Sequence, residues 1–184
     1  ALCRATEGRT LVLFTSYSQL RATARAINRP LSDEGIIVYQ QGAGISRVQL
    51  LENFRTTPRS VLLGTRSFWE GVDVKGDKLK LVIIDKLPFR SPGDPVYKRR
   101  LQYVAEQGGN AFNDVQVPEA TISLRQGVGR LIRDIHDRGI VMIADSRLQN
   151  KAYGQAMLQS LPDMHISKQL DEALDFAAQL QPGR

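Results

Sequence analysis

Residues 60–85 have the sequence SVLLGTRSFWEGVDVKGDKLKLVIID, in which two short apolar runs flank a polar segment that contains glycines. The runs Ser60–Gly64 and Lys80–Asp85 are continuous apolar stretches of strand length, without the polar alternation of a half-exposed strand. Continuous runs of this kind are typical of strands buried on both faces, as in parallel sheets covered by helices. This stretch therefore predicts an α/β fold.

The same alternation of apolar runs and helical patterns extends outward in both directions. Further strands are predicted at Thr10–Thr15, Ile36–Gln40 and Gly139–Ala144. Helices are predicted over Ser18–Asn28, Ser46–Arg55, Val96–Gln107, Glu119–Asp134, Lys151–Gln159 and Lys168–Leu180. A chain of 184 residues suits one domain. We therefore expect one three-layer α/β domain over residues 1–184, with a mostly parallel central sheet flanked by helices.

Three local expectations follow from the same patterns. Pro30 should lie just beyond the end of the first helix. Val48, Leu51 and Phe54 recur at helical spacing and should share a buried face. The polar clusters around Gly108–Asn110 and Asn113–Asp114 indicate a loop.

Composition limits the function classes. The net charge of +6 favours a polyanionic partner, although charge alone fits a solubilising surface equally well. Five basic residues and only one acidic residue (Asp94) lie in one segment: Lys86, Arg90, Lys98, Arg99 and Arg100.

The single cysteine, Cys3, excludes an internal disulfide and a cysteine-built metal cluster, and favours a reducing cytoplasm. No run of about 20 apolar residues suits a membrane span, and the start at Ala1 is compatible with a segment of a longer protein.

The segment Gln126–Arg133 (QGVGRLIR) is the most informative for chemistry. On a helix, Gln126, Arg130 and Arg133 would project within roughly 60° of one another. Gly127 and Gly129 would allow another surface to approach closely. Guanidinium groups match phosphate oxygens and stay charged, so an anion between the two arginines is one explanation of this spacing. A solvated face of surface arginines is the other.

A second candidate segment, Gly64–Lys78, directly follows a predicted strand. Thr65 and Ser67 would offer hydroxyls and free backbone N–H groups to a phosphate. Glu70 and Asp73 suit ribose hydroxyls, a cation or the arginines instead. Gly71 and Gly76 have the spacing of a Walker A loop, but Asp77 occupies the position that requires lysine, so that interpretation is rejected.

The third candidate segment is Phe14–Ser18 (FTSYS), at the end of the first predicted strand. Its hydroxyls and backbone donors would suit a nucleic-acid phosphate, and Tyr17 would stack or pack. Serine and threonine after a strand are also common helix caps, so capping alone explains this motif as well. The sequence likewise leaves two interpretations of Phe68 and Trp69, which would either stack on bases or pack in the core.

In this order the three segments resemble motifs IV, V and VI of superfamily 2 helicases. The likeness is greatest to the DinG/XPD family, including bacterial DinG-like proteins of the YoaA type. It covers essentially the whole chain, and its most specific parts are Ser67–Asp77 (SFWEGVDVKGD), Asp85–Phe89 (DKLPF) and Gln126–Arg133. The resemblance implies a RecA-like second motor domain of an ATP-dependent 5′→3′ DNA helicase that acts in DNA repair or replication.

The resemblance also implies a role for each matching residue. Arg133 would be the arginine finger, Arg130 a second γ-phosphate contact, and Gln126 would set the nucleotide and its attacking water. The nucleotide side of the cleft would be lined by Glu70, Gly71, Asp73 and Gly129. The backbone of single-stranded DNA would be faced by Thr15, Ser16, Tyr17, Thr65, Arg66 and Ser67.

The implied ligands and partners lie mostly outside this chain. ATP with Mg²⁺ would sit between this domain and a first motor domain that carries the Walker A and B residues. Many family members hold an iron–sulfur cluster in that first domain, and Cys3 alone carries no information about one. His136 and His165 have no metal-ligand partner at useful spacing, so no metal site is expected. A monomer is favoured.

Two rival hypotheses remain at this stage. The first is a nucleic-acid-binding module with no part in ATP turnover, which would explain the basic charge but not the Gln126–Arg133 pattern. The second is a Rossmann-type nucleotide-binding enzyme. Gly42 and Gly44 are the only glycine cluster near a strand, and they lack the full dinucleotide-binding fingerprint.

Overall fold

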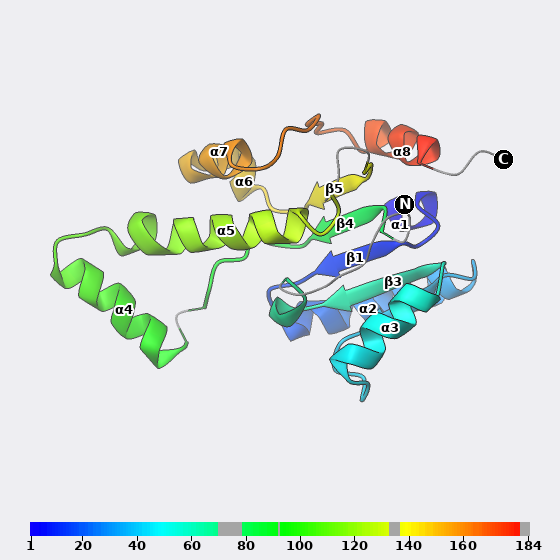
Figure 1. Cartoon of the computed structure of the whole chain (residues 1–184), viewed down its shortest axis with the longest axis horizontal. Helices are drawn as coiled ribbons and strands as arrows, with labels where there is room; N and C mark the ends of the chain where they lie inside the picture. The colour runs from blue at the N-terminus through cyan, green and yellow to red at the C-terminus, as the bar shows by residue number, and fades with distance from the viewer. Residues whose placement is uncertain (70–78, 92, 133–136, 181–184) are drawn as a thin grey trace.

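The computed structural model describes residues 1–69, 79–91, 93–132 and 137–180, apart from the side chain of Arg66. Its centre is a sheet of five strands in the order β2-β3-β1-β4-β5, with every pairing parallel (Figure 1). The strands are β1 (Thr10–Leu13), β2 (Ile37–Gln40), β3 (Ser60–Gly64), β4 (Leu81–Ile84) and β5 (Ile140–Ile143). Each lies within a predicted apolar run, and the predicted α/β class is confirmed.

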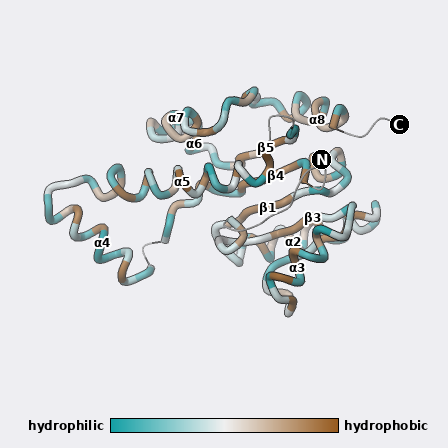
Figure 2. Tube along the Cα trace, in the orientation of Figure 1, coloured by the Kyte–Doolittle hydropathy of each residue, from teal (hydrophilic) through white to brown (hydrophobic). Residues whose placement is uncertain are grey.

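The central strands are apolar on both sides because helices cover both faces of the sheet. Leu11 and Leu13 of β1 point to one face, and Val12 and Phe14 point to the other. All four side chains are buried. Figure 2 shows apolar residues concentrated along the strands. The continuous apolar runs in the sequence therefore reflect a three-layer structure.

The helices divide between the two faces. The Val12 face is covered by α2 (Tyr17–Ser32), α1 (Leu2–Ala5) and α8 (Leu170–Gln179). The opposite face is covered by α3 (Arg47–Thr56), α5 (Val117–Val128), α6 (Arg147–Asn150) and α7 (Ala152–Gln159). The part of the chain that the structure describes contains no helix long and apolar enough to cross a membrane.

An arm made of α4 (Pro95–Glu106) and the start of α5 extends beyond the sheet (Figure 1). The segment η3 (Phe112–Gln116) joins them as a short π-helix, so the predicted loop at Asn113–Asp114 is wrong. Asn110 is the physical reason, because its side-chain oxygen accepts the backbone N–H groups of Phe112 and Asn113 and starts the turn.

Two other local expectations are wrong. Pro30 lies inside α2, which continues to Ser32. The buried Leu31 holds this last turn against the core, which offsets the missing proline N–H. In α3, Val48 is 77% exposed and Leu50 is buried in its place, beside Leu51 and Phe54. The buried face of α3 is therefore rotated from the predicted one.

Gly64, the last residue of β3, leaves room for an aromatic ring. A Cβ atom at this position would lie 2.6 Å from the Cγ atom of Phe68, which is fully buried. We predict that Gly64→Ala lowers the free energy of unfolding by about 1–3 kcal/mol, because the buried ring must shift. Urea unfolding measures the change.

Gly93→Ala is the matched control, since among the described residues its Cβ atom would meet only the Ser91 hydroxyl oxygen, at 3.5 Å. It should change stability by less than about 0.5 kcal/mol. Equal effects of the two substitutions would contradict the packing account.

Candidate functional site

The carboxyl ends of the strands lie along one edge of the sheet (Figure 1). The connection from β1 leads to β2 on one side, and that from β4 leads to β5 on the other. Neighbouring strands whose connections diverge leave a crevice at their carboxyl ends, which is where such sheets bind ligands. The segments that follow β1, β3 and β4 are therefore the candidate site.

The segment after β3 is anchored in the core by two aromatic rings. Phe68 and Trp69 are 0% and 3% exposed. Both rings therefore pack in the core and do not stack on bases. The Trp69 indole N–H points to the carbonyl oxygen of Phe14, at 3.5 Å. The ring links the chain after β3 to the end of β1.

The end of α5 closes over the same tryptophan. A Cβ atom on Gly127 would lie 2.8 Å from the Trp69 ring and 3.3 Å from a Leu13 methyl group. The close approach predicted at Gly127 is thus real, and the approaching surface is Trp69. Arg130 completes the contact, because its Nε and Nη2 groups donate to the Trp69 carbonyl oxygen at 3.2 and 3.0 Å.

The predicted helix Glu119–Asp134 extends too far, because α5 ends at Val128 with Gly129 as its C-cap. The backbone N–H groups of Arg130 and Leu131 bond three residues back, as in a tightening turn. Arg130 therefore lies beyond the helix, and the shared helical face does not exist in the predicted form. Two glycines weaken the helix here, and the bonds from Arg130 to Trp69 favour the turn. Gln126 is exposed in the last turn of α5.

A glutamine that sequence reasoning missed connects β2 to the segment after β3. The Gln41 Oε1 atom accepts both the backbone N–H and the hydroxyl of Thr65, at 2.7 and 2.8 Å. Its Nε2 group donates to the Ser67 hydroxyl oxygen at 3.0 Å. The expectation that Thr65 offers a free N–H and hydroxyl is therefore wrong, whereas Ser67 is exposed. The backbone of Arg66 lies between them in η1 (Arg66–Phe68).

The segment after β1 begins α2. Ser16 is the N-cap, and its hydroxyl oxygen accepts the backbone N–H of Gln19 at 3.3 Å. Thr15 is exposed, and Tyr17 is 44% exposed beside Gly42. Capping is thus confirmed for Ser16. Gly42 packs beside a tyrosine here, and β2 continues into α3 rather than into a dinucleotide-binding turn.

A carboxylate pair after β4 and β5 was also missed. The Arg147 guanidinium, with Nη2 at 2.6 Å from Oδ2, and the Leu87 backbone N–H hold the pKa of Asp145 at about 2. Burial raises the pKa of Asp85, and its Oδ2 atom is buried without a hydrogen-bond partner among the described residues. The signal available in the sequence was position alone, since each aspartate ends or follows a predicted strand.

The basic segment after β4 is largely ion-paired. Arg90 pairs with Asp94, Arg99 with Glu106, and Arg100 with Glu119. Much of its charge therefore has a structural role along the arm.

Several predicted site residues lie outside the described residues. These are Glu70, Gly71, Asp73 and Arg133, and also His136. Within the described ranges, no three histidine, cysteine, aspartate or glutamate side chains gather as metal ligands would.

Comparison with known proteins bears on this arrangement. The model of the helicase C-terminal domain family matches residues 1–164. The chain is 50% identical to the ATP-dependent DNA helicase YoaA of Haemophilus influenzae, over 94% of this chain and 26% of that protein. It is 43% identical to the ATP-dependent helicase DinG of Mycobacterium tuberculosis, over 88% of this chain and 24% of that protein. A solved XPD helicase structure has a TM-score of 0.62 at 22% identity, covering 85% of this chain and 28% of that one.

The chain therefore belongs to the helicase C-terminal domain family, and its fold is RecA-like. Within this family its relatives are helicases of the YoaA and DinG type. The chain spans about a quarter of the length of these relatives.

The low pKa of Asp145 makes its ion pair a source of stability at neutral pH. We predict that Asp145→Asn lowers the free energy of unfolding by about 2 kcal/mol at pH 7, given the fall in pKa from 3.8 to about 2. A carboxyl group whose pKa is depressed by folding stabilises the protein above its unfolded pKa. The difference between wild type and variant should therefore shrink as pH falls from about 4 toward about 2.

Urea unfolding across this pH range measures the difference. Asp163→Asn, at an exposed aspartate with no ion pair among the described residues, is the control and should have little effect. A loss at Asp145→Asn that does not change with pH would contradict this assignment.

Proposed function

We propose that residues 1–184 act as the second motor domain of an ATP-dependent DNA helicase and contribute one side of an ATP site. The observation that carries the proposal is a pair of contacts at the carboxyl edge of the sheet. Gly127 packs against the Trp69 ring, and Arg130 donates two hydrogen bonds to the Trp69 carbonyl oxygen. These contacts place the QGVGR segment against the segment after β3, at the crevice where α/β sheets bind ligands. Family membership and relatives named as ATP-dependent helicases support it.

The nucleotide-facing residues would be supplied by these two segments. Gln126 and Gly129 lie at the end of α5, and Arg130 follows directly. Arg130 is held by two bonds to a backbone carbonyl, so its guanidinium group is pre-positioned. We infer that Arg130 and Arg133 contact the γ-phosphate, with Arg133 as the arginine finger. Glu70, Gly71 and Asp73 would line the same side.

ATP with Mg²⁺ would lie between this surface and a first motor domain that holds the Walker A and B residues. Phosphoryl transfer depends mainly on positioning and charge stabilisation, and an arginine finger supplies roughly 10³–10⁵ in rate. An arginine that comes from a separate domain makes hydrolysis depend on closure of the cleft. Closure then moves one DNA-gripping surface relative to the other. We propose that this cycle drives 5′→3′ movement in DNA repair or replication.

The single-stranded DNA track would follow the exposed hydroxyls at the same edge. Thr15, Ser16 and Tyr17 at the start of α2 and Ser67 in η1 are exposed and suited to backbone phosphates. We assign Arg66 to the same surface. Thr65 would act indirectly, because Gln41 occupies its donors and thereby fixes the position of Ser67.

The first test is DNA-stimulated ATP hydrolysis by a polypeptide that carries both motor domains. Arg133→Ala should reduce hydrolysis by roughly 10³-fold or more while nucleotide binding is retained, as expected of a finger that acts in the transition state. Arg125→Ala, at an exposed arginine in the last turn of α5, is the control and should leave the rate unchanged. The 184-residue chain alone should have no detectable hydrolysis.

Unchanged hydrolysis in Arg133→Ala would contradict the proposed finger. If Arg130→Ala and Arg133→Ala weakened DNA binding and spared hydrolysis, the chain would be a nucleic-acid-binding module without a role in ATP turnover.

The second test concerns the DNA track. We predict that the 184-residue chain binds an oligo-dT strand weakly and that affinity falls steeply as salt rises, because phosphate contacts release counterions. Fluorescence anisotropy at several salt concentrations gives the slope. Ser67→Asp should weaken binding by adding a negative charge at an exposed hydroxyl, whereas Ser91→Asp, outside the track, should not. Binding that is insensitive to salt would argue against backbone contacts.

A further inference from the structure

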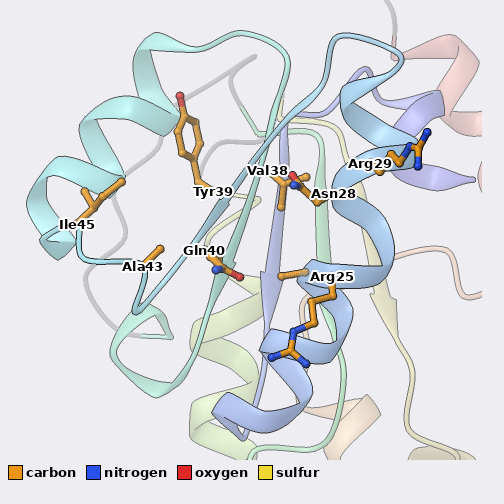
Figure 3. Close-up of a pocket in the computed structure, with 9 residues that line it drawn as sticks. Arg25, Asn28, Arg29, Val38, Tyr39, Gln40, Ala43 and Ile45 are labelled. Carbon is orange, nitrogen blue, oxygen red and sulfur yellow. The ribbon is translucent and has the colours of Figure 1, made fainter.

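A groove lies beside the open edge of the sheet, between α2 and β2 (Figure 3). It encloses about 410 Å³. The residues that matter here are Ala24, Arg25 and Arg29 of α2, Val38 and Gln40 of β2, and Ile45 in the following loop. We call it the β2 groove. Nothing in the proposed helicase chemistry uses it.

One wall of the β2 groove carries positive charge that no described carboxylate neutralises. Arg25 and Arg29 are exposed and four residues apart on α2, and no carboxylate occurs in Tyr17–Ser32. Neither arginine forms an ion pair with a described residue, whereas the nearby Arg4 pairs with Glu34 at 2.7 Å. Like charges at this spacing repel each other on a helix. A negatively charged ligand would relieve that repulsion.

The floor of the β2 groove offers unused backbone hydrogen bonds. β2 is the last strand of the described sheet on this side. The N–H groups of Ile37 and Gln41 donate to the Arg59 and Leu63 carbonyl oxygens on the β3 side. Since alternate residues of a strand bond to the same neighbour, the N–H and C=O groups of Val38 and Gln40 point away from β3. They are available to a further strand.

The spacing between Arg25 and Arg29 matches the spacing between alternate side chains of an extended polypeptide. Side chains two residues apart on a strand point the same way and lie about 6.6–6.8 Å apart. Residues four apart on a helix rise about 6 Å, so Arg25 and Arg29 can meet two such side chains. Ala24, Val38 and Ile45 give the groove apolar contacts between these positions. We propose that the β2 groove binds an extended acidic peptide segment, which adds to β2 as an extra strand and places carboxylates against Arg25 and Arg29.

Binding to the 184-residue chain tests the proposal with a defined probe. The probe is a fluorescein-labelled peptide of about eight residues in which Glu and Val alternate, a length typical of a strand. The Arg25→Glu/Arg29→Glu variant should bind it at least roughly tenfold more weakly, because attraction becomes repulsion. Arg21→Glu, on the same helix but outside the groove, should change affinity by less than about twofold. A peptide with Gln in place of Glu should bind weakly to all three proteins, and circular dichroism checks that each variant is folded.

Residue-resolved amide exchange tests strand addition separately from charge. Bound peptide should slow exchange at Val38 and Gln40, whose N–H groups face the open edge, and not at Ile37, which already bonds toward β3. Absence of peptide binding, equal loss in Arg21→Glu, or unchanged exchange at Val38 and Gln40 would each overturn the proposal. If oligo-dT competes with the peptide and loses affinity in the double variant, the groove belongs to the DNA track instead.

Discussion

The burial of Trp69 is the constraint on which the candidate site depends. The ring fills the space that Gly127 leaves at the end of α5, its N–H points to the end of β1, and its carbonyl oxygen receives Arg130. Because protein interiors are closely packed, the buried ring fixes the segment after β3 and the turn after α5 relative to each other. Glycine is required at residue 127 for that reason, since a Cβ atom would collide with the ring.

This arrangement connects packing to function in the proposed motor. An arginine that contacts a nucleotide across a cleft must be held in a fixed position. The Arg130 guanidinium group is held by two hydrogen bonds to the Trp69 carbonyl oxygen. Gln41 has the corresponding role on the side that we propose faces DNA, because its single side-chain amide holds Thr65 and contacts Ser67. We propose that the two surfaces meet in the short stretch Thr65–Trp69, so that ATP hydrolysis is coupled to DNA through a few residues.

The sequence predicted the sheet well and the details of the site less well. Strands buried on both faces leave a continuous apolar signal, so the five strands were found from runs such as Lys80–Asp85. The helix ends were harder to predict, because tertiary contacts determine them. The buried Leu31 extends α2 past Pro30, and the hydrogen bond from Arg130 to the Trp69 carbonyl oxygen favours a turn after α5. Gln41 and Asp145 have no local motif. The role of Gln41 depends on Thr65, 24 residues away. Asp145 pairs with Arg147 two residues away, but it also accepts the Leu87 N–H from 58 residues away, which only the folded sheet brings close.

The central claim is that this domain completes an ATP site from the far side of the nucleotide. The most direct measurement is the structure of a two-domain polypeptide containing this chain, bound to ADP, aluminium fluoride and single-stranded DNA. The account predicts guanidinium nitrogens of Arg130 or Arg133 within about 3 Å of the fluoride group, a normal hydrogen-bond distance. A nucleotide held entirely by the other domain, with both arginines turned away from it in the closed state, would contradict the account.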